Sequence, residues 1–147
     1  MSIAVDVSRE SVRAGIPEAR VREIVREVCR RERVKDALIS VTFVTNRRMA
    51  RMNREFLGHK GATDVITFEF TSDGIAARTH APVGDVYIAP DVARANAKDN
   101  GVRIRAELVR LVVHGTLHVL GHSHDDGDGR MSGDMWRRQE RIVAALT

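Results

Sequence analysis

Four of the six histidines in the chain lie within eleven residues of one another: His114, His118, His122 and His124. His114 and His118 are four residues apart. On a helix they would share one face, about 6 Å apart along the axis, a spacing that lets two imidazoles bind one ion. Gly121 then breaks the helix and lets the chain turn back, so that His124 can bring a third nitrogen. The pattern therefore predicts a metal site held by His114, His118 and His124.

Three neutral imidazoles leave a divalent ion with its full positive charge and with an open fourth position, as in catalytic zinc sites. A water bound there has its pKa lowered toward about 7, and the ion can polarise a phosphoryl or carbonyl oxygen. The alternative is a closed structural site in which His122 or His59 is the fourth ligand. Three imidazoles favour zinc, although nickel and copper bind them as well. We expect one Zn²⁺ ion per chain.

The histidine spacing is similar to that of the metzincin peptidases, H-E-x-x-H-x-x-G-x-x-H. Those peptidases use the glutamate as a general base, and Gly115 stands at its position here. The run from His114 to His124 matches in full a second motif, H-G-x-L-H-x-x-G-x-x-H, through which the chain resembles the YbeY family. That family comprises bacterial rRNA maturation factors described as single-strand-specific, zinc-dependent endoribonucleases. The resemblance implies that His114, His118 and His124 are the zinc ligands and that they act catalytically through the bound metal.

Further landmarks of the YbeY family occur in the same order along the chain, so that the resemblance covers roughly residues 39–141. It implies a fold with one mixed sheet of about four strands packed with helices. The landmarks are Asn53 with Phe56, residues 63–68, residues 84–88, Glu107 with Leu108, and Met135.

The chain also departs from the family pattern. Leu57 stands where many members carry an arginine thought to be needed for activity. His122 and Ser123 replace a Tyr-Asp pair between the second and third ligands, and Ala62 replaces a proline. Other cations of the same segment are candidates for the role of that arginine: Arg54, His59 and Lys60.

Basic side chains cluster on a short helix that we expect to begin near residue 46. They are Arg47, Arg48, Arg51 and Arg54, followed by His59 and Lys60. Aromatic residues make up only 4% of the chain, so few side chains can stack on bases. We therefore predict that these residues contact RNA phosphates with little sequence specificity. The alternative is a basic face that is merely solvated.

Two acidic residues lie near the ends of predicted strands, Asp64 and Asp85. A carboxylate that accepts a hydrogen bond from a ligand imidazole fixes the orientation of its ring. We predict that Asp64 and Asp85 support the metal ligands in this way. A role in capping the strand ends is the alternative.

The elements that must position these residues follow from the spacing of apolar side chains. Four strands and five helices are predicted, without regular alternation of the two. The fold class is therefore α+β, with a single mixed sheet of about four strands packed with about five helices. The metal-binding helix lies near the C-terminus, at residues 103–120. The expected strands are residues 3–7, 37–44, 63–70 and 84–89, and the other helices are residues 17–31, a short one from 46, 90–100 and 132–146.

Several helix boundaries are predicted from their capping residues. Pro17 suits a first turn, where its missing N–H does no harm. Asn46 is expected to be the N-cap of the short helix. Gly101 is expected to supply the left-handed residue after its helix. The acidic run at residues 125–129 is interpreted as a solvated turn rather than a calcium loop, because it lacks a glutamate at the twelfth position.

Length and composition set the broad class. A chain of 147 residues is expected to form one domain, residues 1–147, with a core that needs no disulfide. The single cysteine, Cys29, lies on an apolar helical stripe, and we expect no disulfide partner. No run approaches the ~20 apolar residues of a membrane span, and no signal peptide is recognisable. We expect a soluble, cytoplasmic protein whose net charge of +4 permits contact with nucleic acid without requiring it.

The leading hypothesis is a zinc-dependent endoribonuclease that cleaves single-stranded RNA during rRNA maturation, including 16S rRNA 3′-end processing, and in ribosome quality control. Its expected partners are single-stranded RNA, ribosomal RNA or the ribosome, and ribosomal proteins. A non-catalytic, zinc-stabilised module that docks on the ribosome is the alternative. A metallopeptidase is less favoured, because Gly115 cannot act as a general base.

Overall fold

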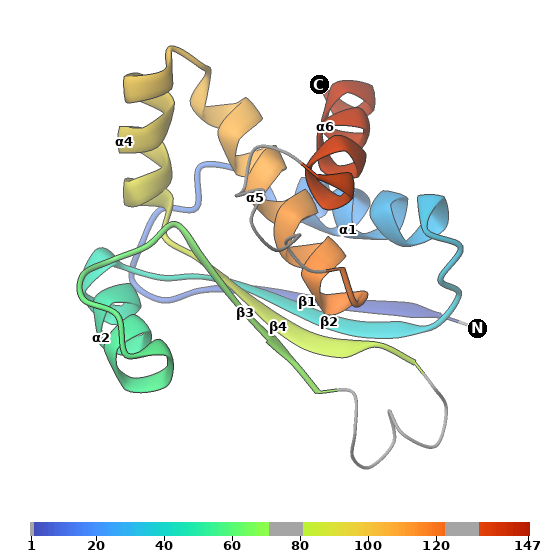
Figure 1. The fold of residues 1–147 in the computed structure, drawn as a ribbon, viewed down its shortest axis with the longest axis horizontal. Coiled ribbons are helices and arrows are strands. Elements are labelled where there is room, and N and C mark those ends of the chain that lie inside the picture. The colour runs from blue at the N-terminus through green and yellow to red at the C-terminus, as the bar shows by residue number, and fades with distance from the viewer. Residues whose placement is uncertain (1, 71–80, 123–132) are drawn as a thin grey trace.

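The computed structural model describes residues 2–70, 81–122 and 133–147. In these parts of the chain, four strands form one sheet and five helices pack around it (Figure 1). The predicted α+β class is therefore confirmed. The strands are β1 (Ile3–Arg9), β2 (Ala37–Phe43), β3 (Val65–Glu69) and β4 (Val83–Ile88). The helices are α1 (Glu18–Arg31), α2 (Asn46–Leu57), α4 (Pro90–Asn100), α5 (Ile104–Val119) and α6 (Asp134–Leu146).

The sheet is mixed, as predicted, and has the strand order β1-β2-β4-β3. β1 and β4 both run parallel to β2, whereas the edge strand β3 is antiparallel to β4. Along β2 and β4, buried residues alternate with less buried ones. Because successive side chains of a strand point to opposite faces, one face of the sheet carries the main core.

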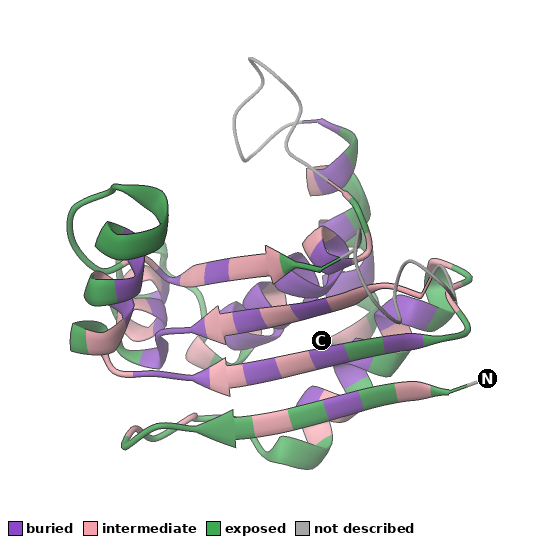
Figure 2. Cartoon of the chain, turned by 90° about the horizontal axis from the view of Figure 1, so that it is seen from below, coloured by how far each residue is buried: buried purple, intermediate pink, exposed green. Residues whose placement is uncertain are grey.

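The helices are distributed unequally over the two faces. Helices α1 and α5 cover the core face, and α4 and α6 pack against α5 (Figure 1). Along β2 and β4, Figure 2 shows buried residues in alternation with half-buried or exposed ones. Among the described residues, Met49 and Met52 of α2 pack against Ile66 of β3 on the face opposite α5. The sheet therefore separates α5 from α2.

Helix α5 is the central element of the core. Eleven of its residues are buried, including His114 and Gly115. A Cβ atom at Gly115 would overlap the side chain of Val86 on β4, and a Cβ atom at Gly84 would lie 2.7 Å from Val119. The two glycines thus allow α5 to lie directly on β4. Despite this burial, no helix in the described residues is long and apolar enough to cross a membrane.

Two predicted helix starts differ from the structure. The N-cap of α2 is Thr45, whose side chain accepts a hydrogen bond from the backbone N–H of Arg48 at 3.1 Å, so the prediction of Asn46 was wrong. Both residue types cap helices well, and the choice between neighbours depends on backbone conformation. Pro17 precedes the first turn of α1 instead of lying within it.

Gly101 follows α4 in the left-handed conformation, as predicted. The predicted turn at residues 125–129 lies outside the described residues.

Candidate active site

His114 and His118 lie together near the C-terminal end of α5. Their ring centroids are 4.7 Å apart and their planes are inclined by 73°. His114 is buried, and His118 is half-buried. The two imidazoles are therefore neighbours on one face of the helix, as their spacing predicts.

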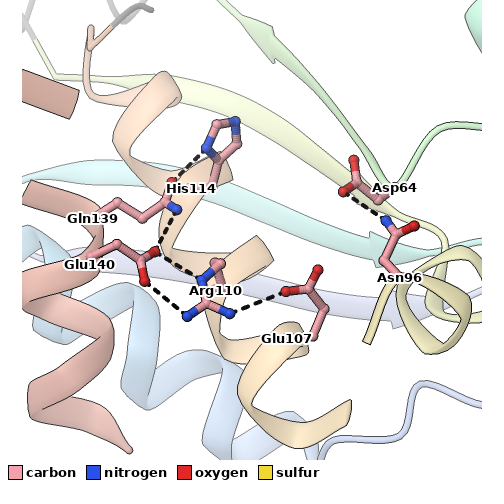
Figure 3. Close-up of polar contacts among 7 residues, drawn as sticks. All are labelled: Asp64, Asn96, Glu107, Arg110, His114, Gln139 and Glu140. Atoms are coloured by element: carbon pink, nitrogen blue, oxygen red, sulfur yellow. Dashed lines mark hydrogen bonds and ion pairs between the residues drawn. The ribbon is translucent and has the colours of Figure 1, made fainter. Parts of the chain in front are cut away.

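The ring of His114 is oriented by Gln139 of α6. The Nδ1 atom of His114 lies 2.7 Å from Oε1 of Gln139, and Nε2 of Gln139 donates to the Glu140 carboxylate at 3.0 Å (Figure 3). Because a carboxylate only accepts, the Gln139 amide nitrogen belongs on Glu140 and its oxygen on His114. His114 must then carry its proton on Nδ1. Its lone pair is on Nε2, the nitrogen through which it can bind a metal.

Behind Gln139 lies an ion-pair network that joins α5 to α6. The Arg110 guanidinium donates to both oxygens of Glu140, at 2.8 and 2.9 Å, and to Glu107 at 3.2 Å (Figure 3). Burial opposes ionisation of Glu140, yet the hydrogen bonds from Arg110 and Gln139 hold its pKa below the ordinary value. The hydrogen bonds that Arg110 donates to Glu140 raise the pKa of Arg110 in turn. The pair is therefore charged at neutral pH. The Glu140 carboxylate holds the amide nitrogen of Gln139 and so leaves the Gln139 oxygen to accept from His114.

Across from this network lie Asp64, just before β3, and Asn96 of α4 (Figure 3). The amide nitrogen of Asn96 is 3.4 Å from the Asp64 carboxylate. Both residues and His114 line a pocket of about 680 Å³. The structure thus brings Asp64 to the same pocket as His114.

The second acidic candidate, Asp85, is placed elsewhere. Its neighbours Gly84 and Val86 face α5, so the side chain of Asp85 points to the opposite face of the sheet. There it accepts a hydrogen bond from Ser40 at 2.6 Å. The structure therefore does not bring Asp85 to the histidine pair.

The other two histidines of the cluster are His122 and His124. His124, the predicted third ligand, lies outside the described residues. His122 is directed at Glu32, with 2.5 Å between Nε2 and Oε1, and Arg138 donates to the other oxygen of Glu32 at 3.0 Å. Within residues 2–70, 81–122 and 133–147, no three His, Cys, Asp or Glu side chains form a group that could hold a metal ion.

The candidate RNA-binding residues lie on and just after α2. Arg47, Arg51 and Arg54 are exposed, whereas Arg48 is half-buried and lies 3.5 Å from Glu10. His59 and Lys60 follow the helix and are exposed as well. Because α2 packs on the face of the sheet opposite α5, the structure does not bring these residues directly against His114 and His118.

Sequence reasoning missed Gln139, Glu140 and Arg110. A signal for Gln139 was present: it shares a helical stripe with Met135, Ile142 and Val143, and only 2% of it is exposed. A polar residue on the buried stripe of an amphipathic helix needs a hydrogen-bond partner in the core. The identity of that partner, 25 residues away on α5, could not be read from the stripe.

Gly115 also bears on the peptidase alternative. A Cβ atom at Gly115 would lie 2.4 Å from the side chain of Val86, so a side chain at this position would be directed at the sheet. A glutamate there would require Val86 to move. The local packing therefore agrees with the absence of a peptidase base in the sequence.

Comparisons with known proteins agree along nearly the whole chain. The family model described as "Endoribonuclease YbeY" matches residues 5–147. A protein of that name from Bacillus licheniformis is 37% identical, over 97% of this chain and 94% of its own length. One from Chlorobium phaeovibrioides is 33% identical, over 92% of this chain and 86% of its own. The solution structure of a Thermotoga maritima protein has a TM-score of 0.68 at 25% identity, covering 97% of this chain and 88% of that one.

Proposed function

The chain belongs to the YbeY endoribonuclease family, and we propose that it is a zinc-dependent, single-strand-specific enzyme that acts in rRNA maturation. Its proposed targets are the 3′ end of 16S rRNA and defective ribosomes. The observation that carries this proposal is the orientation of His114 by Gln139 beside His118. A buried imidazole with a fixed tautomer is the arrangement that metal ligands have in proteins.

The proposed zinc ligands are His114, His118 and His124. The adjacent rings of His114 and His118, and the placement of the His114 lone pair on Nε2, fit such an ion. His124 completes the proposed set on the strength of the sequence motif. When bound, one zinc ion per chain would supply Lewis acidity at the scissile phosphate.

The protein contributes orientation to this chemistry. Gln139 accepts from Nδ1 of His114 and so prevents the ring from turning. Glu140 and Arg110 hold the Gln139 amide in the one orientation that keeps its oxygen on the histidine. Preorganised ligands need no rearrangement during the reaction, which lowers the barrier.

RNA would be held by its phosphates. The exposed side chains of Arg47, Arg51 and Arg54 lie on one helix and present positive charge to a strand that passes over α2. Contacts of this kind give affinity with little sequence preference. A target in rRNA would then be selected by the ribosome or a ribosomal protein, and we propose these as partners.

The proposal can be tested with zinc-loaded protein and three substrates of one sequence: single-stranded RNA, the RNA duplex and single-stranded DNA. We expect cleavage of the single-stranded RNA alone. The target is then tested with a precursor of 16S rRNA, both as free RNA and assembled in the ribosomal subunit. Cleavage of the duplex at an equal rate would contradict strand specificity, and binding to ribosomes with no cleavage of any RNA would favour the docking module.

A further inference from the structure

The pocket beside His114 has the wrong charge for a phosphate group. Three carboxylates line it, those of Asp64, Glu107 and Glu140, and Arg110 is the one arginine or lysine among its described lining residues. The Arg110 guanidinium is directed at Glu140 and Glu107, with distances of 2.8 to 3.2 Å. The lining therefore carries a net negative charge, which repels an anion.

The carboxylates that line the same pocket do not form a second cation site within the described residues. Among the described residues, no three acidic, histidine or cysteine side chains come close enough to hold one metal ion. Part of its wall is apolar instead, formed by Leu111, Val102 and the indole of Trp136. An uncharged ligand with a flat apolar ring fits this combination better than an ion does.

The polar groups of the pocket are built into the fold. Asp64 and Glu107 are each 8% exposed, and Gln139 is 2% exposed. Asn96 adds a side-chain amide at 3.4 Å from Asp64 (Figure 3). Carboxylates only accept hydrogen bonds, so a ligand that presents N–H donors along one edge matches this wall.

We propose that this pocket binds one nucleobase of the RNA substrate and prefers a base with an exocyclic amino group to uracil. The inference rests on the proposed function, because His114 lines the pocket and the zinc ion that it is proposed to hold, rather than the pocket's own charge, would attract the scissile phosphate. Its volume of about 680 Å³ lies within the range of small-molecule sites. Trp136 supplies the stacking surface, and Asp64 with Asn96 meets the edge of the base.

The chain offers a direct probe, because Trp136 is its single tryptophan. Cytidine and uridine have nearly the same size, but cytidine has an amino group at the 4-position beside an N3 acceptor, whereas uridine has a carbonyl there beside a single N3–H donor. Each nucleoside is titrated into the purified full-length protein while tryptophan fluorescence is recorded. We expect saturable quenching by cytidine, with binding at least ~5-fold tighter than that of uridine, as one base-edge contact to a carboxylate provides.

Three variants locate the preference. Asp64→Asn keeps the shape of the side chain and replaces one acceptor by a donor, so we expect cytidine and uridine to bind about equally. Asn96→Ala tests the same edge independently if Asp64→Asn does not fold, and it should weaken cytidine binding by about 5-fold. Asn46→Ala removes an exposed amide from α2 and serves as the matched control, with no expected change.

Equal binding of the two nucleosides by the unmodified protein would overturn the preference, and no saturable quenching by either would overturn the pocket. Neither titration needs turnover, so the result is separable from the test of the nuclease. Metal-dependent cleavage of RNA without nucleoside binding would support the proposed nuclease and reject the base site. Nucleoside binding without cleavage of any RNA would support the base site and reject the nuclease.

Discussion

His114 can bind a metal through Nε2 only if its proton is on Nδ1, and the structure provides the group that holds it there. Gln139 accepts from Nδ1, and Glu140 prevents the amide from turning over. A ligand imidazole that loses such a partner binds its metal more weakly, because ring and tautomer are no longer fixed. Gln139 is therefore expected to affect metal binding along with the histidine.

Replacing Gln139 by alanine should weaken zinc binding by about 10- to 100-fold, the range typical of such supporting groups. The measurement is a competition titration with a chelator of known affinity. Arg137→Ala, an exposed neighbour on the same helix, is the control and should leave the affinity unchanged. Equal zinc affinity in Gln139→Ala and the unmodified protein would show that the hydrogen bond does not support the metal site.

The Glu140–Arg110 pair should make the metal-free protein less stable in acid. The pKa of Glu140 is lower in the folded protein than its ordinary value of 4.5. Its contribution to the free energy of unfolding is therefore present above pH 4.5 and is lost as the pH falls through the lower folded value. In Glu140→Gln this contribution is absent at every pH. The stability difference between the two proteins, from urea unfolding, should shrink from pH 6 to pH 3, and a constant difference would contradict the assignment.

The histidine pair could be predicted from the sequence because both members lie on one helix, four residues apart. Gln139, which contacts the ring of His114, could not be predicted in this way, because it reaches the histidine from a different helix. The role of Asp85 was proposed from its place on a predicted strand. Which face of the sheet it occupies depends on which residues of β4 meet α5, and those contacts form only in three dimensions.

Helix α5 owes its position to the small residues at its contact with β4. Gly115 lies against the side chain of Val86, and Gly84 lies against the side chain of Val119, so that each glycine leaves room for a valine of the other element. Such close packing fixes the height of His114 and His118 above the sheet. The glycine that takes the place of a peptidase base is thus a packing residue.

Gly115→Ala should lower the free energy of unfolding by about 1 to 3 kcal/mol, the usual cost of overfilling a packed core. The measurement is urea unfolding of the single variants and of the double variant with Val86→Ala. Because Val86→Ala vacates the space that the new methyl group needs, the double variant should be more stable than the sum of the two single effects predicts. Additive effects would show that the two side chains do not meet.

Most elements could be predicted because their patterns are strong. The alternation in residues 37–44 and the helical spacing in residues 17–31 both depend on a single buried face. Strand order could not be derived in the same way, since β4 lies between β2 and β3 only through contacts between distant segments. The N-cap of α2 was misassigned by one residue, because Thr45 and Asn46 are both suited to that position.

Two groups of charged side chains, one positive and one negative, lie on different sides of the sheet. Exposed arginines of α2 lie on one side of the sheet, and the carboxylate-lined pocket lies on the other, beside α5. A bound RNA strand would therefore meet positive charge at its phosphates and acceptor groups at one base. Electrostatic affinity and base preference are expected to vary independently.

The arginines of α2 should set the salt dependence of RNA binding. The double variant Arg51→Ala and Arg54→Ala should reduce the slope of log affinity against log salt by about 1.4, or about 0.7 for each lost phosphate contact. Arg26→Ala with Arg30→Ala, two exposed arginines of α1, is the matched control and should leave the slope unchanged. Equal slopes in both double variants would show that the α2 arginines do not contact RNA phosphates and form only a solvated surface.

The α5 histidines are proposed to hold the metal on which RNA cleavage depends. Zinc content and cleavage of single-stranded RNA should be measured on the same preparations of the unmodified protein and of His114→Ala. We predict about one zinc ion per chain and cleavage in the unmodified protein, with both lost together in the variant. Normal cleavage by a zinc-free His114→Ala protein would contradict this role of His114.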